Sequence, residues 1–256
     1  MTQPKSPTLL ISEVFGPTIQ GEGVEAGRAC VFIRTQGCPV HCPGCDTHYT
    51  WDGSEKGTQT PVIDIITKVE EIVRAFPGCG VVLSGGEPLM HYKSAPMMML
   101  LSALWDRDVS WISLETSGYI GKEPIVGVDR DLLEGFLRMF STVHWSPKIT
   151  PCLHGRYTDA ELMTNGPAIL DSFVSTPEQL AIKCVVKNEE DIAVVEAFDR
   201  RWCWSRRGHR VYLMPYGIEA DEMIAISKTL VPHLARTGYI LTPRIHTLLW
   251  GSERQR

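Results

Sequence analysis

Three cysteines, Cys38, Cys42 and Cys45, stand in one short segment at spacings of four and three residues. Closely spaced cysteine thiolates are the usual ligands of iron–sulfur clusters. A cluster of four irons that is held by only three cysteines keeps one iron open to another ligand. The spacing therefore predicts a 4Fe-4S cluster with a free coordination position, and a free position indicates chemistry.

Zinc is the main alternative, because a structural zinc site takes four ligands and His41 or His48 is available as the fourth. His41 lies between two of the cysteines, where tetrahedral ligation from so short a loop is strained, and no second Cys-x-x-Cys pair follows in the sequence. A disulfide framework fits less well, because we expect no export signal and the chain is too long to need such links. The spacing favours the cluster and leaves zinc open.

The composition indicates one globular domain over residues 1–256, since 43% of the side chains are hydrophobic and no linker divides the chain. The polar segments 1–7 and 251–256 are expected to be mobile tails. A formal charge of -5 without a dense Lys/Arg stretch argues against a nucleic-acid partner, and no apolar run is long enough for a membrane. Eight cysteines without an export signal favour the reducing cytoplasm.

Short apolar runs alternate with helical patterns along the chain, which is typical of a parallel sheet with right-handed crossovers. The predicted strands are 29–33, 80–83, 111–114, 142–145, 180–186 and 210–213. The predicted helices are 60–76, 94–105, 129–140, 159–172, 189–199 and 221–234, the first with Thr60 as N-cap and Pro61 as first residue. Polar or glycine-rich motifs follow the strands, where a β/α barrel places its active site. The sequence thus predicts an α/β fold, an incomplete, open TIM-like barrel of about six parallel strands.

The cysteine segment follows the first predicted strand and Gly85-Gly86-Glu87-Pro88 follows the second, an arrangement that resembles the radical S-adenosylmethionine superfamily. In that superfamily the open iron binds S-adenosylmethionine, and one electron splits the sulfonium to a 5'-deoxyadenosyl radical. Glycines let the backbone approach a ligand closely, while Glu87 supplies either an acceptor for an ammonium group or a strand-end cap. Without the cysteines, the same motif is equally consistent with an ordinary turn.

Ile19-Gln20-Gly21-Glu22-Gly23, Arg34 and Cys45-Asp46-Thr47 resemble the 7-carboxy-7-deazaguanine synthase family, over nearly the whole chain. That family converts 6-carboxy-5,6,7,8-tetrahydropterin to 7-carboxy-7-deazaguanine, a ring contraction with loss of ammonia in the biosynthesis of deazapurines such as queuosine. The resemblance implies a 4Fe-4S cluster, S-adenosylmethionine, Mg2+, an electron donor such as flavodoxin or ferredoxin, and a homodimer. Arg244-Ile245-His246-Thr247 departs from the Gln-x-His-Lys of many relatives, and the chain runs further, so a role for a C-terminal carboxylate is not transferred.

The resemblance also implies a role for each matching residue. The substrate-binding residues are Ile19, Gln20, Gly21, Arg34, Ser84 and His246. The residues that contact S-adenosylmethionine are Gly44, Cys45, Asp46, Gly86, Glu87, Ser146, Pro147, Lys148, Met214, Pro215, Tyr216 and Gly217. The metal ligands are Cys38, Cys42 and Cys45 for the cluster and Thr47 for Mg2+. Glu22 and His246 are the candidates for the proton transfer that ammonia loss requires.

Several of these residues have simpler interpretations. Arg34 suits bidentate recognition of a carboxylate, but a salt bridge at a strand end uses the same side chain. Thr47 suits a hard cation, although a threonine after an aspartate is more often a cap. Lys148 and Lys183 stand near strand ends, where lysine is solvent-facing more often than not.

Two other classes of function remain open from the sequence. A glycyl-radical activating enzyme also uses Cys-x-x-x-Cys-x-x-Cys, but it does not require the Gln20-Gly21-Glu22-Gly23 segment or Arg34 before the cluster. A zinc-binding interaction module would carry one zinc and no sulfide.

Overall fold

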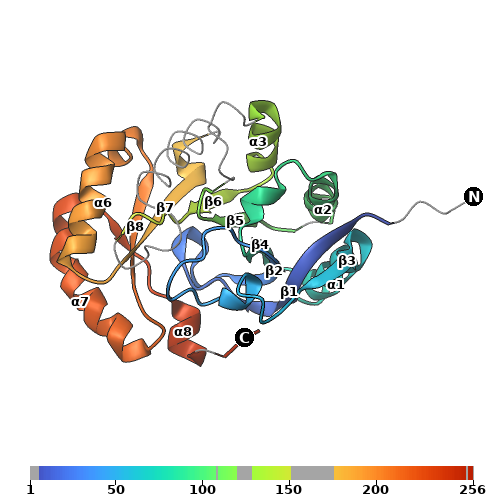
Figure 1. Cartoon of the computed structure of the whole chain (residues 1–256), viewed down its shortest axis with the longest axis horizontal. Helices are drawn as coiled ribbons and strands as arrows, with labels where there is room; N and C mark the ends of the chain where they lie inside the picture. Colours follow the sequence, from blue (N-terminus) through green and yellow to red (C-terminus); the bar gives the residue numbers. More distant parts are fainter. Residues whose placement is uncertain (1–5, 108, 120–128, 151–175, 252, 256) are drawn as a thin grey trace, which may run out of the picture.

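The computed structural model describes residues 6–107, 109–119, 129–150, 176–251 and 253–255. Its strands form one sheet in the order β3-β1-β2-β4-β5-β6-β7-β8-β9. The sheet is curved but open, with α1, α2, α3, α6 and α7 around its outer side (Figure 1). None of the helices in the described chain is long and apolar enough to cross a membrane.

The six predicted strands are all present as a continuous parallel series. They are β2 (Ala29–Thr35), β4 (Gly80–Gly85), β5 (Ile112–Thr116), β6 (Thr142–Trp145), β7 (Leu180–Val186) and β8 (Arg210–Pro215). The predicted count of about six is wrong, because the sheet has three more strands. They are β1 (Thr8–Ile19), β3 (Thr58–Pro61) and β9 (Ile240–Leu241).

The additional strands extend the two edges of the sheet. β1 pairs antiparallel with both β2 and β3, while β9 adds a parallel pair beyond β8. β3 is polar and β9 has two residues, so neither has the apolar run by which a buried strand is recognised. Tertiary pairing, not local sequence, makes these segments strands.

Five of the six α-helices in the described residues agree with the predicted pattern apart from their ends. They are α1 (Val62–Ala75), α2 (Ala95–Trp105), α3 (Arg130–Leu137), α6 (Glu189–Trp202), α7 (Ala220–Thr237) and α8 (Ile245–Trp250). The predicted start of α1 is wrong by one residue, because Thr60 and Pro61 pair with β1 and Pro61 takes the N-cap position. α8 was not predicted, and the predicted helix 159–172 lies outside the described residues.

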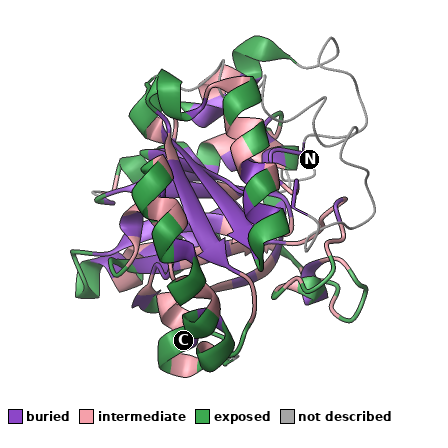
Figure 2. Cartoon of the chain, turned by 90° about the vertical axis from the view of Figure 1, so that its left-hand side faces the viewer, coloured by how far each residue is buried: buried purple, intermediate pink, exposed green. Residues whose placement is uncertain are grey.

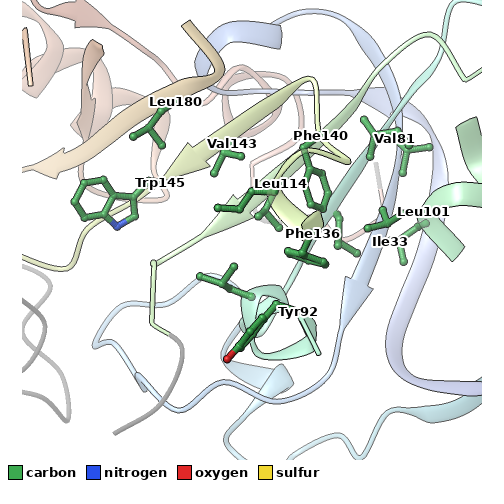
Figure 3. Packing of buried hydrophobic residues seen from close by; sticks show 14 of the residues in the cluster. Ile33, Val81, Tyr92, Leu101, Leu114, Phe136, Phe140, Val143, Trp145 and Leu180 are labelled. Atoms are coloured by element: carbon green, nitrogen blue, oxygen red, sulfur yellow. The ribbon is translucent and has the colours of Figure 1, made fainter. Parts of the chain in front are cut away.

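The hydrophobic core fills the space between the parallel strands and the helices around them. Val81, Leu114 and Val143, on three neighbouring strands, pack with Phe136 of α3 (Figure 3). The central strands β4 to β8 are mostly buried, whereas each helix exposes its outer side (Figure 2). Burying these side chains stabilises the folded chain by about 25 cal/mol for each Å² of apolar surface removed from water.

The opposite face of the same strands carries a different set of side chains. Because successive residues of a strand point to opposite faces, the neighbours of the core residues Leu114, Val143 and Ile182 must point inward. Those inward positions hold polar and charged residues, namely Arg34, Ser113, Glu115, His144 and Lys183. The convex side of the sheet is therefore apolar, while the concave side carries these polar residues beside a second, smaller apolar cluster of Cys30, Val82, Trp111 and Phe32.

Candidate active site

A cavity of about 650 Å³ opens at the carboxyl ends of the parallel strands. Most of the predicted site residues line it: Ile19, Gln20, Glu22, Arg34, Cys38, Cys42, Gly44, Cys45, Asp46, Thr47, Ser84, Gly86, Glu87, Ser146, Lys148, Met214, Tyr216, Gly217 and His246. Three predicted residues, Gly21, Pro147 and Pro215, lie outside this wall. Pro147 and Pro215 are both buried, and each lies next in sequence to a residue that lines the cavity.

The three cluster cysteines follow β2 and are partly buried free thiols. Burial raises the pKa of Cys38 to about 12 and also raises the pKa of Cys42. Iron binding at this loop must therefore displace protons. Among the described residues, no group of three His, Cys, Asp or Glu side chains is placed to hold a single metal ion.

The Gly85-Gly86 pair lets the cluster loop lie directly against the end of β4. Gly86 N–H donates to the carbonyl of Thr35, and Glu87 N–H donates to the carbonyl of Gly37, one residue before Cys38. A Cβ atom on Gly86 would lie 1.8 Å from the Gly37 carbonyl oxygen. The glycine is thus required by the close approach of two backbones, as the motif predicted.

Glu87 links the end of β4 to the end of β5. Its carboxylate accepts hydrogen bonds from the backbone N–H groups of Leu89 and Ser117 at 3.0 and 2.8 Å, and from the hydroxyls of Thr116 and Ser117. Burial raises the pKa of Glu87 despite these donors. Of the two roles considered for Glu87, these contacts correspond to the strand-end cap.

The glycines of Gln20-Gly21-Glu22-Gly23 are explained by two histidines. A Cβ on Gly21 would lie 1.9 Å from His246 Nδ1, and one on Gly23 would lie 2.7 Å from His144 Cε1. Gly23 also has φ +68°, in the left-handed region that favours glycine. This segment, between β1 and β2, therefore fits between α8 and the inner face of β6 only if both positions lack a side chain.

Lys183 of β7 lies at the centre of a buried charge network. Its side chain is 2% exposed, and Nζ lies 2.7 Å from Glu22 Oε2 and 2.5 Å from Glu115 Oε2. Burial alone would lower the pKa of Lys183, but the two carboxylates outweigh it and the pKa is raised. The general tendency of strand-end lysines to face solvent does not hold here, because two carboxylates compensate the buried charge.

Glu22 is held as an anion by its neighbours. Burial would raise its pKa, but Lys183 and Arg244, whose Nε lies 3.4 Å from Glu22 Oε1, lower it well below the ordinary value. Arg244 also reaches Asp46, at 3.8 Å, and so links this network to the cluster loop.

His144 of β6 lies between two carboxylates. Nδ1 is 2.7 Å from Glu115 Oε1, and Nε2 is 2.8 Å from Glu25 Oε2, the latter an ion pair and not a well-aligned hydrogen bond. Burial would lower the pKa of His144, but Glu115 and Glu25 raise it to about 9. An ionised carboxylate offers only lone pairs, so both ring nitrogens carry protons.

The charge on His144 predicts a pH-dependent stability. Because the pKa is about 9 in the folded chain and 6.5 ordinarily, this contribution is complete below pH 6.5 and is lost as the pH rises through 9. The loss amounts to at most about 3 kcal/mol of unfolding free energy. Urea unfolding of wild type and His144→Gln between pH 6 and 9.5 measures it. Parallel pH curves for the two proteins would contradict the assignment.

Arg34, at the end of β2, is oriented by an acid and two aromatic rings. Nε donates to Glu13 Oε1 at 2.8 Å, and the guanidinium lies 5.7 and 5.6 Å from the ring centres of Phe15 and Phe32. Its Nη atoms have no hydrogen-bond partner among the residues that the structure describes. Arg34 therefore forms the salt bridge that was its simpler interpretation, and its Nη groups still present a pair of donors.

The C-terminal residues lie against the same acid. Arg254 Nη2 is 3.3 Å from Glu13 Oε2, Gln255 Nε2 donates to the same oxygen at 2.9 Å, and Arg254 also pairs with Glu55 at 2.6 Å. The Arg254 guanidinium stacks over Tyr49, 3.7 Å from its ring centre. These contacts hold Arg254 and Gln255 against the rest of the protein. The polar composition of 251–256 had instead predicted a mobile tail.

The remaining predicted residues lie on the other side of the cluster loop. Thr47 takes the N-cap position of a short 3-10 helix, His48–Thr50, but its side chain caps nothing and its Oγ1 is 3.5 Å from Cys45 Sγ. Lys148 Nζ donates to Ser146 Oγ at 2.9 Å. Tyr216 closely approaches Gly44, since a Cβ there would lie 2.4 Å from the tyrosine hydroxyl.

Sequence analysis missed Glu25, Glu115, His144 and Arg244 as site residues and left Lys183 in doubt. One signal was present, because Lys183 is the only charged residue in the apolar run Leu180–Val186. A charge inside a buried strand needs a partner, so the run itself indicates a network. Nothing in the sequence identifies which acids supply the partners.

Comparison with known proteins gives consistent matches. Residues 19–133 match the family model described as a 4Fe-4S single cluster domain. A 7-carboxy-7-deazaguanine synthase from Halobacterium salinarum is 31% identical over 96% of this chain and 91% of its own length. Synthases of the same name from Hyperthermus butylicus and Pyrobaculum aerophilum are 31% and 29% identical, over 94% and 97% of this chain and 92% and 98% of their own lengths.

Solved structures share the fold at lower identity. QueE from Escherichia coli superposes with a TM-score of 0.54 and 21% identity, covering 92% of this chain and 93% of its own. SuiB from Streptococcus suis bound to S-adenosylmethionine gives a TM-score of 0.51 and 13% identity, over 80% of this chain and 44% of its own. At these identities the likeness concerns the fold alone.

Proposed function

Because the chain belongs to the 7-carboxy-7-deazaguanine synthase family, we propose that it contracts the ring of 6-carboxy-5,6,7,8-tetrahydropterin to give 7-carboxy-7-deazaguanine and ammonia. The observation that carries the proposal is that one cavity holds the cluster cysteines together with Gln20, Glu22 and Arg34. A glycyl-radical activating enzyme does not need the latter three residues, and a zinc-binding interaction module does not account for them.

The cofactor half of the cavity is formed by the cluster loop and the ends of β4, β6 and β8. Cys38, Cys42 and Cys45 would hold the 4Fe-4S cluster, and Lys148 and Tyr216 would help to enclose S-adenosylmethionine. When both are bound, reductive cleavage of the sulfonium supplies a 5'-deoxyadenosyl radical for hydrogen abstraction. The protein must then hold the substrate in the orientation that favours rearrangement over quenching.

The substrate half of the cavity is charged in a way that fits a carboxylated pterin. Arg34 presents paired donors to the carboxylate, while Glu22 and Glu115 present acceptors to the amino and ring N–H groups of the pyrimidine. Lys183 keeps both acids ionised without occupying all of their lone pairs. The carboxylate of the substrate would thus be bound at the end of β2, and its pyrimidine ring would be bound near β5 and β7.

His246 is better suited than Glu22 to the proton transfer that accompanies ammonia loss. Glu22 is paired with Lys183 and its pKa is lowered, so it accepts a proton poorly at neutral pH. Burial lowers the pKa of His246, which keeps its imidazole neutral and able to act as a base. We assign the proton transfer to His246 and a binding role to Glu22.

We propose that Thr47 is a Mg2+ ligand, because it lines the cavity and its side chain caps no helix. Thr47→Ala is expected to raise the Mg2+ concentration for half-maximal activity roughly tenfold, which corresponds to about 1.4 kcal/mol. Thr47→Ser keeps the hydroxyl and is expected to retain the wild-type dependence. An unchanged Mg2+ titration in Thr47→Ala would remove this residue as a ligand.

The family likeness also supports a homodimer, reduction by a flavodoxin or ferredoxin, and a cytoplasmic location. Sedimentation of the reconstituted protein tests the first of these proposals. Turnover with each reduced donor in place of a chemical reductant tests the second.

The deciding experiment is an anaerobic assay of the reconstituted protein with reductant, S-adenosylmethionine, Mg2+ and 6-carboxytetrahydropterin. We expect about four irons per chain and formation of both 5'-deoxyadenosine and 7-carboxy-7-deazaguanine. Formation of 5'-deoxyadenosine without the deazaguanine would retain the radical chemistry and reject the substrate. One zinc with no sulfide would reject both.

A further inference from the structure

We propose that His144 and Glu25 are a positioning pair that holds the acceptor groups of Glu115 and Gln20 in place, and thereby selects a substrate edge that donates hydrogen bonds. The inference rests on the proposed function and deepens it, since it assigns substrate recognition to residues behind the cavity wall. Neither His144 nor Glu25 lines the cavity, whereas Glu115 and Gln20 both do.

The four residues form a chain of contacts that leads from the interior to the cavity. Glu25 pairs with His144, His144 pairs with Glu115, and Gln20 Nε2 donates to Glu115 Oε1 at 2.9 Å. His144 is 0% exposed, and Glu25 and Gln20 are each 2% exposed. Buried polar groups with so many partners keep one arrangement, because breaking any link leaves an uncompensated group.

The two ring N–H groups of His144 hold the carboxylates on either side of it in this chain of contacts. A doubly protonated ring donates toward Glu115, so Glu115 is an ionised acceptor. Gln20 must then present its amide nitrogen to Glu115, which turns its oxygen toward Glu22 N–H at 3.3 Å. If His144 lost its Nδ1 proton, a ring lone pair would face Glu115 Oε1 and repel it, so the carboxylate and the Gln20 amide that donates to the same oxygen would shift. The acceptor surface that faces the substrate would then be displaced, although Lys183 still keeps Glu115 ionised.

The charges around His144 support the protonated form at neutral pH. Glu25 comes from the segment before β2, Glu115 from β5 and Lys183 from β7, and the two acids outweigh the lysine. Tyr212 of β8 also faces Glu25, and burial raises its pKa, so it stays neutral. Three acids, Glu22, Glu25 and Glu115, are thus matched by three cations, Lys183, Arg244 and His144.

The functional consequence is selectivity for substrates with adjacent N–H donors. A pterin pyrimidine carries an amino group beside a ring N–H, and an ionised carboxylate accepts from both. A substrate that presents a carbonyl in place of the amino group would face repulsion from Glu115. A site with such buried hydrogen-bonding groups rejects a substrate that lacks the matching donors, because that substrate leaves polar groups of the site unpaired.

The test is the pH dependence of KM and kcat for the pterin in Glu25→Gln, with Glu71→Gln on the exposed side of α1 as matched control. Removing one adjacent carboxylate lowers the pKa of His144 by about one to three units, and each unit changes its protonated-to-neutral ratio tenfold. We expect KM of Glu25→Gln to be near wild type at pH 6.5 and about tenfold higher at pH 8.5. 5'-Deoxyadenosine formation without pterin should match wild type at both pH values.

A second measurement determines the charge of His144 in the wild-type protein, so it does not depend on the folding of Glu25→Gln. Nitrogen-15 NMR of labelled histidine in the reconstituted wild-type protein is expected to show both ring nitrogens of His144 protonated at pH 8, with the signal identified by its absence in His144→Gln. A neutral ring at pH 8, or coincident KM–pH profiles for Glu25→Gln and wild type, would overturn the inference. Absence of pterin turnover in wild type would instead reject the proposed function.

Discussion

Replacing Lys183 with methionine is expected to destabilise the protein by roughly 3–5 kcal/mol and to abolish formation of the deazaguanine. The substitution keeps most of the side-chain volume and removes the charge that Glu22 and Glu115 share. Two carboxylates then remain buried without a cation, and at least one must take up a proton or leave the site. Urea unfolding and product analysis measure the two effects.

Two further variants separate the charge effect from packing. Lys68→Met, on the exposed side of α1, removes a lysine that has no such neighbours and should change neither stability nor activity noticeably. Lys183→Met combined with Glu115→Gln removes one of the stranded charges and should recover part of the lost stability. If the single variant were as stable as wild type, the network would not be the charge-balanced unit described here.

Replacing Gly86 with alanine is expected to lower reductive cleavage of S-adenosylmethionine at least about a hundredfold, since a displacement of about 1 Å has that effect on catalytic geometry. The new Cβ would lie 1.8 Å from the Gly37 carbonyl oxygen, so backbone must move. Gly37 precedes Cys38, and its movement displaces the first cluster ligand. Iron content and 5'-deoxyadenosine formation report the result.

Gly135→Ala in α3 is the matched control, because a Cβ at that position meets no atom within 4 Å. It should leave iron content unchanged and stabilise the helix by about 0.5–1 kcal/mol. Wild-type iron content and cleavage in Gly86→Ala would show that the two backbones are not held together as the structure indicates.

The interior of the fold could be predicted from the sequence because its signals are local. Six apolar runs identified the six central parallel strands, and apolar spacing identified α1. The edge strands could not be predicted in this way. β3 has no apolar run, and Thr60 and Pro61, which fit a helix start, are recruited by pairing with Thr8 and Leu9.

The residues of the candidate site also divide into those that the sequence could predict and those that it could not. Cys38, Cys42 and Cys45 lie within one short segment, so their spacing alone indicates a common ligand. Arg34 and Glu13 are 21 residues apart, and Lys183 and Glu22 are 161 apart, so no spacing rule connects them. Long-range pairs of this kind depend on which strands become neighbours.

The sequence by itself determined the cluster loop, the order of the central strands and the glycines that permit close approach, because each depends on a few consecutive residues. Only the tertiary structure decided that Glu22, Glu25, Glu115, His144 and Lys183 form one buried unit. The physical reason is that strand alternation gives each residue a face, while curvature of the whole sheet decides which inward side chains meet. The charges and pKa values of these side chains then depend on which other charged groups lie beside them, and not on any residue alone.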